Sequence, residues 1–426
     1  MLIREATLPD GRVRDVRIEG ERIVAVEAGL DPSDTESVVE AAGQRLFPGA
    51  IDVHVHFREP GMAYKESWAS GSASAAAGGV TTVVDQPNTD PPTVDGRGFD
   101  RKAALASTSY VDYGINGGVS PDWDPDALFD RPLFALGEVF LADSTGDMGI
   151  ARSQFADAVA HATAADVPVT VHAEDERAFD DSVRDRDDAA AWSAYRPPEA
   201  ELSAIETAIE VAEHSDVSLH IAHASTPEGV DAARRADLTC EVCPHHLFLS
   251  VDDLETLGTI GRMNPPLRDE ARREGMWERL VAGEIDIVAT DHAPHTAAEK
   301  DGSIWETASG VPGVETMLPL LLAAAERGDI SHDRVAAVTA RRPAAIFGLE
   351  RKGRIAPGYD ADLVLVDPER RREIDAADLH TAATWTPFAG MTGVFPSRTF
   401  VRGTVVFEDG TFNAPIGRNV REIERN

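Results

Sequence analysis

Apolar residues follow two different patterns along the chain. Over its long middle part, a short run rich in Val, Ile and other apolar residues is repeatedly followed by a longer, Ala-rich amphipathic segment. Runs of the first kind predict buried strands, and segments of the second kind predict helices. The eight predicted strands lie within residues 50–57, 78–88, 109–119, 132–141, 167–175, 217–225, 237–246 and 285–295.

Eight strands that alternate with helices predict an α/β fold, a TIM-type (β/α)8 barrel, which we place at residues 48–349. The chain length of 426 residues accommodates such a barrel and a smaller domain. Both chain ends instead alternate polar and apolar residues around Gly and Asp turns. We therefore expect a small β-sandwich domain built from residues 1–47 and 350–426.

Polar side chains suited to chemistry gather at one place in this repeat. They lie at or near the C-terminal ends of the predicted strands, which is the face of a (β/α)8 barrel where active sites assemble. The set comprises His54, His56, Asn88, Glu138, His172, His223 and Asp291.

His54 and His56 form an H-x-H pair on the first of these strands, and the two-residue period of a strand places both rings on one face. Such a pair alone is a modest signal, because strands carry it by chance. His172, His223 and Asp291 recur at equivalent places on later strands. Imidazole nitrogens and a carboxylate suit zinc or another divalent cation, so together they predict a metal site.

Acidic residues dominate the charge of the chain. Asp and Glu number 74 against 40 Lys and Arg, the formal net charge is −34, and lysine occurs only at 65, 102, 300 and 352. Such a surface repels nucleic acid and anionic membranes, so we exclude both as partners. Excess negative charge keeps halophilic proteins soluble in salt, and the composition therefore predicts a salt-loving source.

The two cysteines, Cys240 and Cys243, form a C-x-x-C inside a predicted strand, where such a pair points to opposite faces. We interpret them as ordinary reduced thiols rather than a redox or zinc motif. No apolar run reaches the roughly 18 residues of a membrane-spanning helix, and the N-terminus lacks a secretory signal pattern. We expect a cytoplasmic protein.

Longer motifs make the chain recognisable. The segment DVHVHFREPGMAYKESWASGSASAAAGGVTTVVDQPNT is followed by EVCPHHL, NPPLR, DHAPHT and VPGVET, and the C-terminal part contains GRIAPGYDADLVLVD and VRGTVVFEDG. Together they closely resemble the dihydroorotases of the amidohydrolase superfamily over nearly the whole chain. That resemblance implies reversible, metal-dependent cyclisation of N-carbamoyl-L-aspartate to dihydroorotate in pyrimidine biosynthesis.

The resemblance also implies roles for individual residues. His54, His56 and Asp291 would bind one zinc ion, or another divalent cation, and His172 and His223 would bind a second where one is present. Asp291 would also act as general base and acid. Substrate contacts would come from Arg58, Asn88, Asn264 and His295, and residues 296–310 would form a mobile loop over the site.

One position departs from the family pattern. Many relatives carry a carboxylated lysine on the fourth strand, where it bridges two metals, whereas the aligned residue here is Glu138. Glutamate carries the same charge on a shorter stem. It could bridge two metals, bind one, or serve only as a buried ion-pair partner, and the sequence leaves these three interpretations open.

Arg58 indicates the substrate class, because a planar guanidinium binds an α-carboxylate through two parallel hydrogen bonds. The alternative role for this arginine is a surface salt bridge. Two other functions compete: an allantoinase or hydantoinase, which generally lacks this arginine, and a catalytically inactive barrel that supports another pyrimidine enzyme. The retained donor residues argue against the inactive barrel. We expect a homodimer, and association with aspartate transcarbamoylase stays open.

Overall fold

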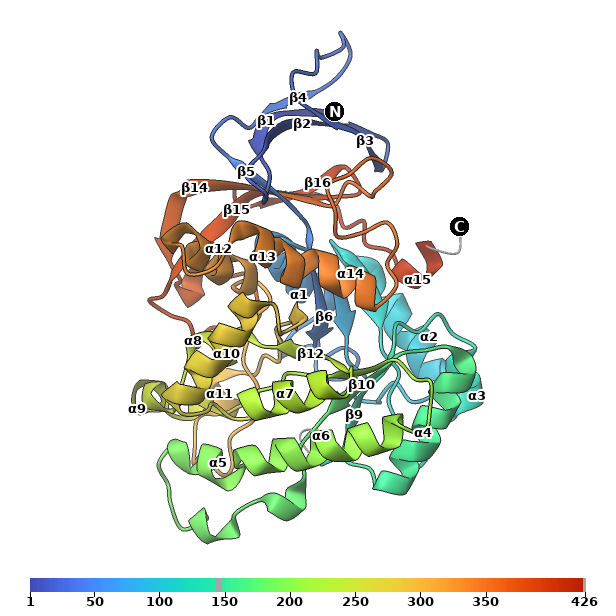
Figure 1. Cartoon of the computed structure of the whole chain (residues 1–426), viewed down its shortest axis with the longest axis vertical. Coiled ribbons are helices and arrows are strands. Elements are labelled where there is room, and N and C mark those ends of the chain that lie inside the picture. Colours follow the sequence, from blue (N-terminus) through green and yellow to red (C-terminus); the bar gives the residue numbers. More distant parts are fainter. Residues whose placement is uncertain (143–147, 424–426) are drawn as a thin grey trace.

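The computed structural model describes residues 1–142 and 148–423, and its central strands run parallel (Figure 1). Each of the eight predicted apolar runs contains a strand. One sheet has the order β6-β7-β8 and another the order β13-β12-β11-β10-β9, so the predicted α/β fold with parallel strands is confirmed. Their bounds are β6 Ala50–Val55, β7 Val80–Asp85, β8 Asp112–Ile115, β9 Leu136–Phe140, β10 Val169–His172, β11 Leu219–Ile221, β12 Thr239–Val242 and β13 Ile287–Val288.

Isolated bridges connect the two parallel sheets at both of their edges. Gly117, beyond β8, pairs in parallel with Leu136 of β9, and His292, beyond β13, pairs in parallel with Val55 of β6. The amide of His56 also donates to the carbonyl of His292 at 2.8 Å. The first and last strands of the repeat are therefore neighbours in space.

Helices fill the intervals between the strands, and their starts are set by local capping. The side chains of Ser67, Asp95, Thr226 and Asp269 accept from backbone amides in the first turn of the helix that each precedes. The helices are α1 Trp68–Ala77, α2 Gly96–Leu105, α3 Pro125–Phe129, α4 Arg152–Ala165, α5 Ala190–Tyr195, α6 Pro198–Ala212, α7 Pro227–Arg235, α8 Pro244–Phe248, α9 Leu254–Leu257, α10 Glu270–Ala282, α11 Ala297–Lys300, α12 Met317–Arg327, α13 His332–Ala336, α14 Arg342–Ile346 and α15 Val420–Ile423.

The central strands are apolar because both of their faces are covered. Every residue of β6, β7 and β9 is buried, as expected for parallel strands enclosed by helices. Polar side chains within such strands must find partners. Those near the C-terminal ends do so with one another, and they make up the candidate site.

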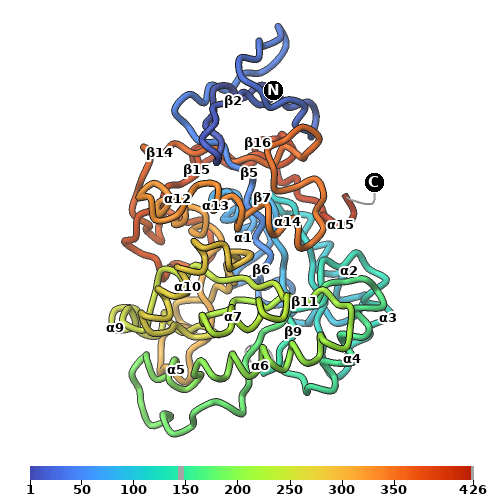
Figure 2. The backbone as a smooth tube through the Cα atoms, in the orientation of Figure 1, coloured from blue at the N-terminus to red at the C-terminus, as the bar shows by residue number. Residues whose placement is uncertain are grey.

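Strands from both chain ends join in another sheet, at the top of Figure 1, where blue and red segments also meet in the tube of Figure 2. Its order is β17-β16-β15-β14-β5-β1-β2-β3, with β4 paired to β1. The bounds are β1 Leu2–Thr7, β2 Val13–Glu19, β3 Arg22–Glu27, β4 Val38–Glu40, β5 Arg45–Pro48, β14 Leu363–Glu373, β15 Thr392–Val401, β16 Thr404–Glu408 and β17 Thr411–Phe412.

This sheet is one continuous hydrogen-bonded path that folds back on itself. The amide of Gly358 donates to the carbonyl of Ile23, and the amide of Ala361 donates to that of Glu21, so β3 returns to the start of β14. Ile23 and Phe400, far apart in the strand order, belong to the same buried apolar cluster. The composite sheet thus encloses a small core of its own.

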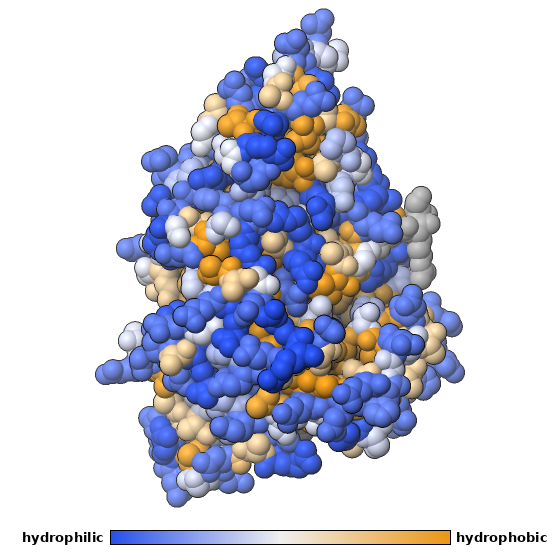
Figure 3. Space-filling model, in the orientation of Figure 1, coloured by the Kyte–Doolittle hydropathy of each residue, from blue (hydrophilic) through white to orange (hydrophobic). Residues whose placement is uncertain are grey.

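The lysines contribute little to the charge of the surface. All four lysines are buried, with exposed fractions of at most 9%, so the exposed cations of the described surface are arginines. Hydrophilic residues cover most of the face in Figure 3. None of the described helices has both the length and the apolarity to cross a bilayer.

We predict a strong dependence of thermal stability on salt. Repulsion within a chain of net charge −34 destabilises the compact state in dilute buffer. At about 1 M salt the Debye length falls to roughly 3 Å, and most of that repulsion is screened. The melting temperature, measured by calorimetry, should rise steeply from dilute buffer to molar KCl. A melting temperature that does not change with salt would contradict this explanation of the acid excess.

Candidate metal centre

Six side chains predicted as metal ligands converge where the parallel strands end. His54, Glu138 and His172 lie in β6, β9 and β10, whereas His56, His223 and Asp291 lie just after β6, β11 and β13, and all six are buried. Their contacts are His56 Nε2–Asp291 Oδ1 at 2.9 Å, His54 Nε2–Glu138 Oε2 at 3.3 Å, His172 Nδ1–Glu138 Oε1 at 2.9 Å and His223 Nε2–Glu138 Oε1 at 2.5 Å.

Glu138 is shared by two groups of donors. Its Oε1 contacts His172 and His223, whereas its Oε2 faces His54 and, at 3.9 Å, His56. Each of these two histidine pairs forms, with Glu138, a three-residue set whose ligand atoms all lie within 4.8 Å of one another. The carboxylate therefore lies between the two histidine pairs in this geometry.

Local backbone structure explains how a short side chain reaches this position. Gly137 has φ of 148°, and a Cβ there would lie 2.0 Å from the hydroxyl of Thr170 on the next strand. Only glycine permits such an approach. The amide of Glu138 donates to Gln86 Oε1 at 2.8 Å, which fixes the residue between its neighbours.

Three residues of the site have backbones in the left-handed region that non-glycine residues rarely adopt. These are Arg58 with φ of 63°, His223 with φ of 35° and Asp291 with φ of 46°. Such conformations cost on the order of 1–3 kcal/mol each and persist where surrounding structure enforces them. Strain of this kind gathers at functional sites.

Additional carboxylates orient the rings, and the sequence did not identify them. Glu241 Oε1 lies 2.6 Å from His54 Nδ1, and Glu174 Oε2 lies 3.0 Å from His172 Nε2. Arg196 in turn donates to Glu174 at 2.5 Å. A pairing of histidine with carboxylate behind a metal ligand is a common arrangement. The sequence contained one signal that could have identified Glu174. It follows His172 by two residues, which is the spacing of side chains on one face of a strand.

The hydrogen bonds also test whether the donors suit a cation. A carboxylate can only accept, so His54 Nδ1 donates to Glu241, and its Nε2 faces the carboxylates of Glu138 and Asp291. That Nε2 is buried and has no hydrogen-bond partner among the described residues. Despite burial, Glu138 and Glu241 raise the pKa of His54 well above its usual range. A divalent cation at Nε2 would take the place of that proton between the carboxylates, so the residues fit a metal.

The pKa shifts point to the same electrostatics. Burial opposes charge on these groups, but the neighbouring histidines hold the pKa of Glu138 well below its usual range, and His56 and His54 do the same for Asp291. Despite burial, Glu138 and Glu174 raise the pKa of His172 to about 9. The negative potential that favours a proton on that ring equally favours a cation.

A cavity opens directly over the donors. Besides five of the six donors it is lined by Arg58, Asn88, Phe140, Asn264, Ala293, Ser309 and Gly310. Asn88 Oδ1 lies 2.7 Å from His56 Nδ1, and Asn264 Oδ1 accepts from Trp192 at 3.0 Å. Three of the four predicted substrate-contacting residues therefore face the cavity beside the donor set.

His295 does not line this cavity. Its Nδ1 accepts from Lys65 at 3.2 Å, its Nε2 donates to the carbonyl of Ser309 at 2.9 Å, and Arg58 Nη2 lies 3.1 Å from the ring. The ring therefore contacts Arg58 from outside the cavity. Burial together with Arg58 and Lys65 keeps the pKa of His295 below its usual range, so the ring is neutral.

The segment predicted as a mobile loop contains α11 and reaches the cavity at Ser309 and Gly310. The buried ammonium of Lys300 donates to the carbonyls of Arg262, Ala308 and Gly310 at 2.9–3.1 Å. The loop is tethered to its neighbour in this way, and its motion stays a prediction.

Comparison with known proteins identifies the family. The model of the amidohydrolase family matches residues 45–406. The chain belongs to the amidohydrolase family. A dihydroorotase of Halobacterium salinarum is 63% identical over 99% of this chain and 100% of its own length. An allantoinase of Rubrobacter xylanophilus is 36% identical over 99% and 97% of the two chains.

Among solved structures, an L-hydantoinase (dihydropyrimidinase) from Arthrobacter aurescens superposes with a TM-score of 0.93 at 28% identity, covering 98% of both chains. A D-hydantoinase superposes with a TM-score of 0.88 at 27% identity, over 99% of this chain and 98% of that one. This amidohydrolase is therefore a metal-dependent cyclic amidohydrolase, which argues against the inactive-barrel alternative.

We predict that Glu138→Gln lowers metal content. The substitution keeps the shape and removes the shared negative charge, so the metal bound per chain after dialysis should fall, as measured by elemental analysis at high salt. Activity of the reconstituted wild type should be indifferent to added or removed bicarbonate, because no lysine lines the described cavity.

Glu201→Gln is the matched control, since Glu201 is equally buried but binds Ser225 and Thr226 outside the donor set. It should retain its metal. Unchanged stoichiometry in Glu138→Gln would mean that Glu138 is not a ligand and would favour a single ion on His54, His56 and Asp291.

Proposed function

We propose that this protein is a dihydroorotase, which reversibly cyclises N-carbamoyl-L-aspartate to (S)-dihydroorotate with loss of water in pyrimidine biosynthesis. The observation that carries the proposal is the buried guanidinium of Arg58 in the wall of the cavity, beside the metal donors. The dihydroorotase of Halobacterium salinarum, at 63% identity, supports it.

Arg58 has the properties of a carboxylate receptor. Its exposed fraction is 2%, and it forms no salt bridge with any carboxylate of the described residues. Its Nε donates only to the carbonyl of Pro294, at 3.3 Å. A buried guanidinium with neutral partners strongly favours an anionic ligand, and the α-carboxylate of the substrate supplies that charge.

Asp291 is the general base and acid of the proposed reaction. Its carboxylate lines the cavity, and its lowered pKa keeps it in the ionised form that can accept a proton, although a low pKa by itself makes a weaker base. In hydrolysis it takes a proton from water and delivers it to the ring nitrogen. In the biosynthetic direction it takes a proton from the ureido nitrogen and delivers it to the departing oxygen, which takes a second proton from solvent and leaves as water.

The cofactor we propose is Zn²⁺, one or two ions per chain, or another divalent cation with a similar preference for nitrogen and oxygen ligands. His54, His56 and Asp291 would hold one ion, and His172 and His223 the second, with Glu138 between them. A bound divalent cation lowers the pKa of a water molecule and polarises the carbonyl that is attacked. Asn88 and Asn264 would position the substrate, and His295 would support Arg58.

We infer a closed (β/α)8 barrel at residues 48–349, supported by the bridges Gly117–Leu136 and Val55–His292, and a composite β-sandwich at residues 1–47 and 350–426, supported by the folded-back sheet. We also propose a cytoplasmic homodimer that binds neither nucleic acid nor membrane.

Asp291→Asn should keep the fold and lose activity by about two to four orders of magnitude, the usual scale for a general base. Metal content must be measured on the same sample, because the residue is also a proposed ligand. Asp286→Asn, five residues earlier and bonded to Arg342 and the amide of Cys240, is the control and should stay active. Near-normal turnover in Asp291→Asn would end the assignment.

Arg58→Ala should lower kcat/KM for dihydroorotate by roughly 10- to 150-fold, because hydrogen bonds to charged groups contribute about 1.5–3 kcal/mol. An uncharged cyclic imide should suffer much less in the same variant. Equal losses on both substrates would indicate a structural role. Turnover of allantoin or hydantoin, but not dihydroorotate, by the wild type would favour the alternative function.

A further inference from the structure

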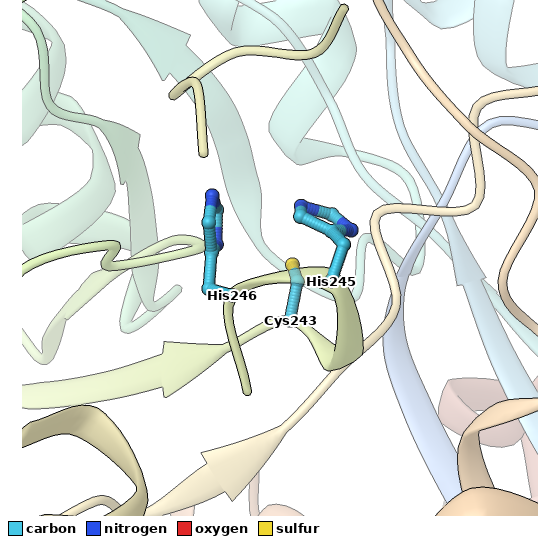
Figure 4. A group of neighbouring side chains, drawn as sticks. All are labelled: Cys243, His245 and His246. Carbon is cyan, nitrogen blue, oxygen red and sulfur yellow. The ribbon is translucent and has the colours of Figure 1, made fainter. Parts of the chain in front are cut away.

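A second cluster of potential ligands lies where β12 ends, outside the donor set of the metal centre. Cys243 follows β12 by one residue, and His245 and His246 lie in the first turn of α8. Their exposed fractions are 0%, 1% and 3%, and their ligand atoms all lie within 4.8 Å of one another. Figure 4 shows the three side chains on one side of the turn, with the sulfur between the two rings.

The local backbone accounts for this convergence. Val242 ends the strand, so Cys243 lies just outside the predicted strand that was expected to hold both cysteines. Pro244 begins the helix and fixes the turn. The spacing of three ligands within four residues thus comes from a strand end and a first helical turn.

Hydrogen bonding leaves lone pairs inside the cluster. His246 Nε2 lies 3.0 Å from the carbonyl of Pro265, which can only accept, so Nε2 carries the proton and Nδ1 the lone pair. His246 Nδ1 and His245 Nε2 are both buried, and neither has a hydrogen-bond partner within the described part of the chain. Buried polar atoms are normally paired, so two orphans beside one thiol require an explanation.

We propose that Cys243, His245 and His246 form a separate metal site for one Zn²⁺ or a similar borderline-soft divalent cation. Two imidazole nitrogens and one thiolate are a donor set that zinc prefers. The carbonyl of Pro265 orients His246 as outer partners orient metal-bound histidines elsewhere. The ion would hold the end of β12 and the start of α8 together. The hydrogen bond from His246 would then connect them to the carbonyl of Pro265, next to Asn264 in the cavity wall.

The two rings are in the neutral form that binds a metal, whereas the thiol must lose its proton. Burial lowers the pKa of His245 to about 4, and burial together with His245 lowers that of His246 well below its usual range, so both rings are neutral. Burial raises the pKa of the Cys243 thiol, and Asp291 adds to the effect. Binding therefore breaks the S–H bond, releases one proton to solvent and forms the thiolate–metal bond.

X-ray absorption of the zinc-loaded wild type tests the proposal without any variant. The donors of the main centre are nitrogen and oxygen only, so a sulfur atom in the zinc shell reports the second site. We expect a shell with a sulfur contribution. A shell of nitrogen and oxygen alone at saturating zinc would overturn the proposal.

Cobalt titration provides the matched comparison. Wild-type enzyme titrated with Co²⁺ in the absence of oxygen should develop a thiolate-to-cobalt charge-transfer band. Cys243→Ser should lose the band and bind one ion fewer per chain, and His246→Asn should weaken binding by more than the roughly 10- to 100-fold typical of losing an outer partner.

Cys240→Ser is the control, because Cys240 is also buried and free but lies within β12, outside the cluster. It should keep the band and the full metal content. A band that survives in Cys243→Ser, or that disappears in Cys240→Ser alone, would contradict the assignment. If Cys243→Ser does not fold, the sulfur signal of the wild type decides.

Discussion

One buried carboxylate, that of Glu138, lies among four imidazole rings, and the arrangement of the strand ends depends on it. Its two oxygens contact different histidine pairs, so a single side chain links β6 with β10 and with the segment after β11. A carboxylated lysine at this position would reach the same place on a longer stem. Here the reach comes from the backbone, because Gly137 lets β9 lie directly against Thr170.

The charges around Glu138 are balanced in successive layers. Carboxylates and imidazoles alternate outward from the centre, through Glu241 to His220 on one side and through Glu174 to Arg196 on the other. Removing one partner from such a buried network is costly, because it leaves a charge without compensation. The network therefore fixes ring orientation and tautomer before any ion arrives, which is preorganisation for metal binding.

The composite sheet is coupled to the central strands through buried charges as well. Lys352 donates to Asp112 of β8 at 2.8 Å and to Asp362, just before β14, at 2.5 Å, and Arg402 also pairs with Asp112. Lys102 similarly pairs with Asp85 at the end of β7, at 2.6 Å. In a chain whose surface is strongly acidic, lysine is kept for interior positions where an ammonium has specific partners.

The sequence by itself determined the parallel strands, their order in the repeat and the side chains that meet at the candidate metal centre. These features are local: the period of apolar residues defines a strand, and imidazole or carboxylate at a strand end defines a candidate ligand. The sequence also indicated Arg58 and raised the question of Glu138. The sequence could not decide between the three possible roles of Glu138, because they depend on distances between strands that are far apart in the chain.

Only the tertiary structure decided which atoms meet. It placed Glu138 between two histidine pairs, turned His295 away from the cavity toward Arg58, and brought Glu241 behind His54. It also placed Cys243 outside its strand and beside two histidines with unpaired nitrogens. Side-chain direction and hydrogen-bond partners arise from packing between distant segments, and no pattern confined to one segment encodes them.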